Sequence, residues 1–383
     1  MKILYIIHSC VMGGATISLA NLIKGVRAIG NEVAIVYPIE KDISVIKEFE
    51  ELGCKCFCLK RIPCTWYFFD GIKNKIRLPL YILKLLIEKR IFYYQLKKII
   101  MKENPDIIHT NVGVVHEGFA VARKLAIPHV WHLREYQVKD FRGHPFPFMW
   151  YFAKKLKRSY TVCITKDIQK YFDLHDCSKS FTIYDPVMSE NYMPAKKKGM
   201  SNAPYFFVAN RISREKGIED IILAFYDFYK NNHFYKILIC GFGDEPYINF
   251  LKEKCAKLHI ENAVEFLGYA SSKKVYELMC NSRALIVGSY NEGFGRMTAE
   301  ANMLGVPVIG RNTAGTKEIL DQTAGGLQFF TINDLVNKMN TISHMTEIEI
   351  ADFMKGAKAK AKDLFSNEQH INKIISLYDA IVK

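Results

Sequence analysis

Two glutamates and two glycines lie close together in the second half of the chain, within residues 289–301. Glu292 and Glu300 are eight positions apart, which places them roughly two helical turns from each other. Gly293 and Gly295 free the backbone beside Glu292, and the N–H groups at a helix start can bind phosphate. The carboxylates can accept hydrogen bonds from hydroxyl groups. A ligand with a diphosphate and several hydroxyls satisfies the whole stretch, and a nucleotide sugar is such a ligand.

Two cations lie upstream of this stretch. Arg211 follows the apolar run 205–208, and Lys216 precedes a helical pattern over 217–229. Arginine supplies a bidentate fork and lysine a point charge, so a diphosphate between them would be neutralised as it leaves. A solvated turn with incidental charges is the alternative interpretation.

Two glycine pairs also follow predicted strands. Gly13 and Gly14 come after the run 2–7, and Gly241 and Gly243 come after the run 236–240. Glycine lets a backbone approach a ligand closely. Neither pair completes the G-x-G-x-x-G fingerprint of nicotinamide or flavin sites, and a plain tight turn remains the alternative for each.

The elements that must position these residues alternate between short apolar runs and helical patterns. This alternation predicts an α/β protein with two tandem doubly wound, Rossmann-like domains. We expect a first domain over residues 1–192, a polar linker over 193–203, a second domain over 204–364 and a final helix over 365–383 that crosses back to the first domain. The predicted strands are 2–7, 32–37, 54–59, 106–109, 129–133, 161–164, 181–183, 205–208, 236–240, 264–267, 284–287, 306–309 and 327–329; the main predicted helices are 16–29, 80–101, 217–229, 246–258 and 297–304.

Composition excludes several classes of protein. The 383 residues are 49% hydrophobic and 24% charged, which excludes a disordered chain, and no apolar run is long enough to span a membrane. The first residues indicate a strand and no export signal, so we expect a cytoplasmic protein. Cys54, Cys56 and Cys58 alternate along a predicted strand, which favours buried free thiols over a metal site. No D-x-D motif occurs, and we expect no metal.

The positive charge is concentrated in the first half of the chain. Residues 1–200 hold 32 Lys and Arg against 18 Asp and Glu, whereas residues 201–383 hold 21 of each. Within the first half, residues 71–102 combine apolar and basic residues with a single glutamate. This segment is either a surface helix on the anionic cytoplasmic face of a membrane or a core helix whose basic face is solvated. Nucleic acid is not expected, because no zinc-finger, RNP-like or helix-turn-helix signal is present.

The E-x7-E spacing of Glu292 and Glu300 with Gly-Phe-Gly inside it, together with Arg211, Lys216 and the Gly13–Gly14 pair, resembles the retaining glycosyltransferases of family 4, which have the two-domain GT-B fold. The resemblance implies that Glu300 holds the nucleotide ribose and that Glu292 contacts the donor sugar. It implies a catalytic set of Glu292, His132, Arg211 and Lys216, and a donor-binding set of Gly13, Gly14, Arg211, Lys216, Gly241, Gly293, Phe294, Gly295, Arg296 and Glu300.

The resemblance also implies a reaction. A sugar would pass from a UDP- or GDP-linked donor, with retention and without a cofactor or metal, to a hydroxyl of a glycan or lipid-linked glycan in cell-surface polysaccharide or lipopolysaccharide synthesis. His109 and Asn111 are candidate acceptor contacts in the first domain. The alternatives are a non-catalytic nucleotide-sugar-binding protein and a GT-B-type epimerase. The chain departs from the family pattern at Asn210, at Thr165 and at 184–186, where Asp185 stands in place of an Asn-Gly pair.

Overall fold

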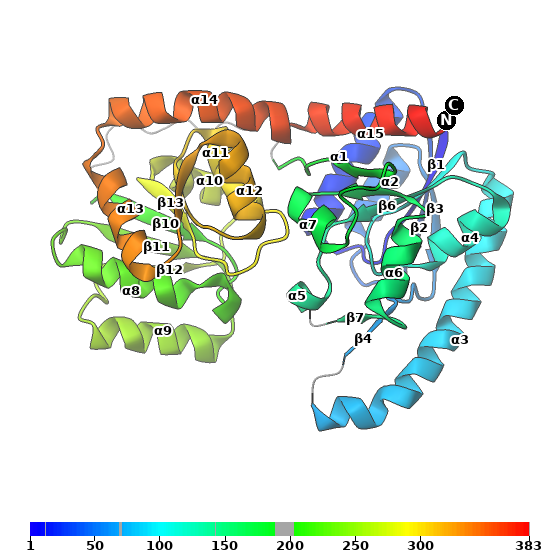
Figure 1. Ribbon diagram of the computed structural model, residues 1–383, viewed down its shortest axis with the longest axis horizontal. Helices are drawn as coiled ribbons and strands as arrows, with labels where there is room; N and C mark the ends of the chain where they lie inside the picture. The colour runs from blue at the N-terminus through cyan, green and yellow to red at the C-terminus, as the bar shows by residue number, and fades with distance from the viewer. Residues whose placement is uncertain (12, 69–70, 142, 188–202, 383) are drawn as a thin grey trace. The chain divides into compact units, whose positions relative to one another are not determined.

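The computed structural model describes residues 1–11, 13–68, 71–141, 143–187 and 203–382. The chain forms two compact units: unit 1 contains Met1–Pro186 and Asn367–Lys383, and unit 2 contains Val187–Ser366. The predicted linker 193–203 lies outside the described residues except for its last position. Each unit is built around one large parallel sheet with helices on its faces (Figure 1). The predicted class of two tandem Rossmann-like domains is therefore confirmed.

The sheet of unit 1 has seven strands in the order β3-β2-β1-β5-β6-β8-β9. All seven were predicted to within two residues at either end. A two-residue antiparallel pair, β4 (Trp66–Tyr67) and β7 (His144–Pro145), was not predicted. The seven strands are β1 (Lys2–Ile6), β2 (Glu32–Pro38), β3 (Lys55–Leu59), β5 (Ile107–Thr110), β6 (His129–Leu133), β8 (Tyr160–Cys163) and β9 (Ser180–Thr182).

Strand β1 is buried on both faces of this sheet, as its unbroken apolar sequence requires. Ile3 and Tyr5 point into one core, which α1, α2 and α15 close. Leu4 and Ile6 point into the opposite core, which α3 and α4 close. The helices of unit 1 are α1 (Gly14–Ala28), α2 (Ser44–Glu51), α3 (Ile72–Glu103), α4 (Glu117–Leu125), α5 (Val138–Phe141), α6 (Met149–Leu156), α7 (Lys166–Tyr171) and α15 (Asn367–Val382).

Unit 2 has a six-stranded parallel sheet in the order β12-β11-β10-β13-β14-β15. Helices α8, α9 and α13 cover one face around a core that includes Phe225, Leu251 and Met339. Among the described helices of the chain, none is long and apolar enough to cross a membrane. The elements of unit 2 are β10 (Tyr205–Ala209), the short 3-10 turn Arg214–Lys216, α8 (Ile218–Tyr229), β11 (Lys236–Cys240), α9 (Glu245–Lys257), β12 (Val264–Gly268), α10 (Ser272–Asn281), β13 (Ala284–Val287), α11 (Arg296–Leu304), β14 (Val308–Arg311), α12 (Ala314–Thr323), β15 (Gly326–Phe329), α13 (Ile332–His344) and α14 (Glu347–Phe365).

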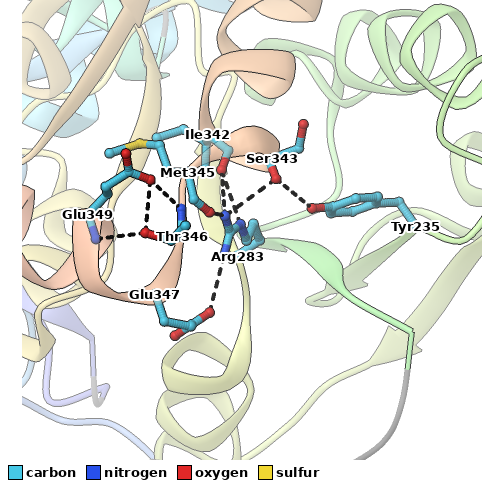
Figure 2. Close-up of polar contacts among 8 residues, drawn as sticks. All are labelled: Tyr235, Arg283, Ile342, Ser343, Met345, Thr346, Glu347 and Glu349. Carbon is cyan, nitrogen blue, oxygen red and sulfur yellow. Dashed lines mark hydrogen bonds and ion pairs between the residues drawn. The ribbon is translucent and has the colours of Figure 1, made fainter.

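Arg283 joins the start of β13 to the end of α13 (Figure 2). Its guanidinium donates to the Ile342 carbonyl from Nε at 3.1 Å and from Nη2 at 2.9 Å, and also to the carbonyl of Met345. Carbonyls at a helix C-terminus lack partners within the helix, so the arginine satisfies groups that would otherwise be left without one. Arg283 therefore fixes the α13–α14 junction against the strand that leads to Glu292.

Replacing Arg283 with methionine should lower the free energy of unfolding of unit 2 by about 2–3 kcal/mol, because the carbonyls lose a charged donor. Glu347→Gln is the matched control: Glu347 contacts the same guanidinium at 3.1 Å, but its side chain is 68% exposed. We expect the control to change stability by less than about 1 kcal/mol. Urea unfolding measures both effects, and equal losses in the two variants would contradict this role of Arg283.

Candidate functional site

The strand order of unit 2 reverses between β10 and β13. Ligands of doubly wound sheets bind beyond the carboxyl ends of the strands at such a reversal. The two loops singled out from the sequence, 210–217 and 288–295, follow these two strands and are joined by a hydrogen bond from the Tyr290 N–H to the Glu215 carbonyl at 3.0 Å. The loop after β14 also joins them, since the Gly315 N–H donates to the Glu292 carbonyl at 2.9 Å. Three loops thus meet at the expected ligand position.

Lys216 and Glu292 form an ion pair at this position, although 76 residues separate them in sequence. The Lys216 Nζ lies 3.0 Å from the Glu292 Oε2, and the side chains are 16% and 20% exposed. Their partial exposure leaves both groups accessible to a ligand. An incoming phosphate would compete with the carboxylate for Lys216, and a sugar hydroxyl would compete with the ammonium for Glu292.

Arg211 does not share this pair. Its Nη2 lies 2.6 Å from Glu215 Oε1, and the two side chains are 55% and 52% exposed. An ion pair so exposed stabilises the fold by no more than about 1 kcal/mol, so the guanidinium is free to exchange its partner. The structure thus places Lys216 beside Glu292 and places Arg211 at the outer side of the same loop.

Glu300 lies in the second turn of α11 and is 3% exposed. Its Oε1 accepts hydrogen bonds from Arg296 Nε at 2.9 Å and from the Tyr276 hydroxyl at 3.1 Å. Burial raises the pKa of Glu300, and Arg296 and Tyr276 oppose this rise. Both donors use Oε1, which leaves Oε2 to accept from a ligand. Sequence reasoning missed Tyr276, because nothing local to α10 connects it with the E-x7-E stretch.

Two glycines of the predicted donor set, Gly241 and Gly295, serve the packing of unit 2. Gly295 caps α11 with a φ of 88°, a conformation that favours glycine. Gly241 has a φ of 150°, and a Cβ there would lie 1.8 Å from the Asn210 carbonyl oxygen. Phe294 is buried, with its ring 5.8 Å from that of Phe365. Its side chain therefore belongs to the core, and only the backbone around Gly293–Gly295 can face a ligand.

Gly13 and Gly14 begin α1 in unit 1. The N–H groups of Thr16 and Ile17 both donate to the Gly13 carbonyl, at 3.1 and 2.9 Å. A Cβ on either glycine would meet no atom within 4 Å, so packing inside the described residues does not require glycine at these positions. Binding of an anion by the first N–H groups of this helix stays a prediction from the sequence.

His132 is fully buried in unit 1, at the end of β6. Arg134 Nη2 lies 3.3 Å from His132 Nδ1, and Arg134 Nη1 donates a hydrogen bond to Asp185 Oδ2. Burial lowers the pKa of His132 well below its usual range, and Arg134 lowers it further. Because Nδ1 accepts from a guanidinium, the single proton of the neutral ring is on Nε2. His132 is therefore a neutral hydrogen-bond donor through Nε2, which has no hydrogen-bond partner among the described residues and lies 3.8 Å from Asp185 Oδ1.

The acceptor candidates lie in the same buried cluster. His109 is fully buried, and its Nδ1 lies 2.5 Å from the hydroxyl of Tyr378 on α15. Asn111 is 3% exposed and accepts from Arg134 Nη2 at 3.3 Å. His109 thus offers no exposed atom to an acceptor, in contrast to the sequence expectation. Asp185, noted as a departure from the family pattern, pairs with Arg134 and also accepts from Ser18 at 2.8 Å.

Glu135 follows this cluster and accepts a hydrogen bond from the Gly113 N–H at 3.0 Å. Burial raises the pKa of Glu135 to about 7. The fold therefore favours the protonated form, and this stabilisation is lost as the pH rises through 7. We expect the melting temperature of Glu135→Gln to rise relative to wild type between about pH 5 and about pH 8. A difference that does not change with pH would contradict the raised pKa of this half-buried carboxyl.

The clustered thiols give no metal centre. Cys54 is buried and Cys56 half-buried, whereas Cys58 is exposed, so the prediction that all three are buried is wrong for Cys58. Cys58 is exposed because β3 is the edge strand of its sheet. Among the described residues, no group of three or more His, Cys, Asp or Glu is placed to hold a metal ion.

Known protein families match both halves of the chain. Residues 12–186 match Glycosyltransferase Family 4, and residues 192–359 match Glycosyl transferases group 1. An alpha-monoglucosyldiacylglycerol synthase of Acholeplasma laidlawii is 25% identical, covering 96% of this chain and 93% of that protein. The sulfoquinovosyl transferase SQD2 of Arabidopsis thaliana is 23% identical, covering 85% of this chain and 63% of that protein.

Solved structures share the fold. The Anabaena protein Alr3699/HepE in complex with UDP superposes with a TM-score of 0.78 at 18% identity, covering 99% of this chain and all of that one. The lipopolysaccharide outer core galactosyltransferase WaaB in its apo form has a TM-score of 0.72 at 15% identity, covering 99% of both chains. These likenesses are to proteins with the GT-B fold, in agreement with the two parallel sheets described above.

Proposed function

We propose that this chain, which is a glycosyltransferase with a Family 4 domain followed by a group 1 domain, transfers a hexose from a UDP- or GDP-linked donor to a hydroxyl of a lipid-linked acceptor. The observation that supports the donor half is that the Lys216–Glu292 ion pair and Glu300 all follow the two strands at the reversal of unit 2, β10 and β13. One cation and two carboxylates there match a ligand with one diphosphate and several hydroxyls.

In this proposal each side chain has one task. Glu300, fixed by Arg296 and Tyr276, accepts from the ribose hydroxyls through Oε2. Lys216 exchanges Glu292 for the diphosphate and stabilises the charge that develops as it leaves. Positive charge from Lys216 and Arg211 at this site is the basis for proposing that no metal is needed.

The released carboxylate of Glu292 then faces the sugar. As the bond from the anomeric carbon to the diphosphate oxygen breaks, positive charge develops on the ring, and a nearby carboxylate stabilises it. The acceptor oxygen forms the new bond to the same carbon and loses its proton. We propose that the anomeric configuration is retained, on the basis of the E-x7-E resemblance.

The acceptor half of the proposal rests on different support. The relative named alpha-monoglucosyldiacylglycerol synthase has a lipid in its name, and its similarity extends over nearly the whole chain. The excess positive charge of residues 1–200 suits an acceptor presented at an anionic surface. A lipid-linked glycan or glycolipid at the inner face of the cell membrane is the acceptor class we propose.

The test is to incubate the full chain with UDP- or GDP-hexoses, with a membrane lipid extract in one reaction and without any acceptor in the control. The proposal predicts a glycosylated lipid whose anomeric proton shows the same configuration as the donor sugar. Release of an altered nucleotide sugar without a new glycosidic bond would identify an epimerase instead. Binding of the donor with no turnover on any extract would favour a non-catalytic nucleotide-sugar-binding protein.

A further inference from the structure

Helix α3 is apolar on two opposite faces. One face packs into the core of unit 1 through Phe92, Leu96 and Ile100. The other face carries large apolar side chains that are exposed, at spacings of three, four or seven residues, which places them on one stripe. The stripe of α3 consists of Ile76, Leu80, Leu83, Ile87, Ile91, Tyr94 and Met101, which are between 50% and 73% exposed.

This arrangement decides between the two interpretations of residues 71–102. A core helix with a solvated basic face would expose mainly lysine and arginine, but the side chains at the centre of the exposed face are apolar. Single exposed apolar residues need no explanation, whereas a stripe of them along about seven turns of helix indicates a binding surface. The stripe lies on the long helix at the edge of unit 1 in Figure 1.

The charges around the stripe identify the kind of partner. Exposed Lys84, Arg90 and Lys98 lie beside it. From Ile76 to the end of the helix the acidic residues are Glu88 and Glu103, and each is already paired with a cation, Arg61 at 2.5 Å and Lys2 at 2.6 Å. Glu88 is shared between Arg61 and Lys84, whose Nζ lies 4.0 Å from it. The surface therefore presents apolar groups together with an excess of positive charge. An anionic lipid bilayer has the complementary combination of acyl chains and negative head groups.

Exposed aromatic residues also lie on α6, which follows a short strand pair that contacts α3. The Tyr81 hydroxyl donates to the Trp66 carbonyl at 3.0 Å, which connects α3 with β4, and β4 pairs with β7. Helix α6 begins four residues after β7, and its second and third residues, Trp150 and Tyr151, are 57% and 41% exposed. Their rings lie under the ammonium groups of Lys154 and Lys155, at 4.9 and 4.5 Å. Tryptophan and tyrosine with adjacent lysines are typical of the membrane–water interface.

We propose that the stripe of α3 is the surface on which unit 1 docks to an anionic lipid bilayer, and that exposed Trp150 and Tyr151 on α6 contribute to the docking. The helix lies in the plane of the interface, with the stripe inserted at the boundary of head groups and acyl chains and the flanking cations at the phosphates. The inference deepens the proposed function, because it rests on a lipid acceptor and names the surface that brings the chain to it.

The test is flotation of the full chain with vesicles of phosphatidylcholine alone or mixed with phosphatidylglycerol. We expect the wild type to bind the mixed vesicles and not the neutral ones, with high salt weakening the binding. The double variant Leu83→Glu/Ile87→Glu should lose binding by at least about tenfold, since two groups that insert become charged. The control is Ile348→Glu on α14, an equally apolar residue that is 74% exposed in unit 2, and it should bind like wild type.

Equal binding of the double variant and wild type would overturn the inference, as would no binding to either vesicle. A concentration-dependent dimer in light scattering that the double variant abolishes, without vesicle binding, would show instead that a second copy covers the stripe. Donor-induced thermal stabilisation, measured without vesicles, separates this inference from the proposed function. If donors stabilise the protein but it does not bind vesicles, the docking surface is wrong and the proposed function stands. If it binds vesicles but no donor stabilises it, the proposed function is wrong.

Discussion

Glu300→Gln should weaken binding of the nucleotide sugar by roughly 10²-fold, the loss expected when two hydrogen bonds to a charged acceptor become neutral ones. Glu300 is 3% exposed and held by Arg296 and Tyr276. Glutamine keeps the size of the side chain, and burial already disfavours the charge of Glu300 by raising its pKa, so the fold should tolerate the change. Isothermal titration with UDP- and GDP-sugars measures the effect.

Two further variants give this experiment its controls. Glu265→Gln changes an exposed carboxylate on β12 of the same unit and should leave donor affinity unchanged. Tyr276→Phe removes one of the two bonds that hold Glu300 and should weaken binding by less than Glu300→Gln does. Donor affinity equal to wild type in Glu300→Gln would remove Glu300 from the donor site.

Lys216→Met should lower kcat by about 10²–10³-fold, with a smaller change in KM, because its charge acts most strongly on the departing diphosphate. The change also leaves Glu292 without the ammonium that lies 3.0 Å from it. Steady-state kinetics on the product assay described above measures both constants. Lys338→Met is the control, since Lys338 lies on α13 and pairs there with Asp334 at 3.5 Å.

The double variant Lys216→Met/Glu292→Gln separates catalysis from simple neutralisation of Glu292. If Lys216 serves the diphosphate, kcat of the double variant is well below that of Glu292→Gln alone. If the lysine does no more than compensate Glu292, the double variant and Glu292→Gln have the same kcat. That second result would contradict the role proposed for Lys216.

The fold could be predicted from the sequence because parallel strands are buried on both faces. Each such strand is a short apolar run, as in Ile3–Ile6 and Leu285–Val287, and the helices between them have their own period. β4 and β7 were not predicted because a strand of two residues is too short to show an alternating apolar pattern. Their pairing also joins positions that are far apart in sequence.

The candidate site was predictable only where its residues are close in sequence or follow a strand. Glu292, Glu300 and Lys216 satisfy that condition. Tyr276, which bonds to Glu300 from a different helix, does not. His109 was predicted as an acceptor contact, but it lies inside β5 and is fully buried, where its Nδ1 contacts the hydroxyl of Tyr378, 269 residues later in the sequence. Long-range packing of this kind leaves no local signal.

The central claim is that a nucleotide sugar binds at the carboxyl ends of β10 and β13, and hydrogen–deuterium exchange of the full chain tests it most directly. Saturating donor should slow exchange of the backbone N–H groups in residues 211–217 and 289–300, where three loops already meet. Backbone groups in the C-terminal half of α9, residues 251–257, should exchange at an unchanged rate. Protection confined to other segments, or no protection with any UDP- or GDP-sugar, would contradict the donor site proposed for Lys216, Glu292 and Glu300.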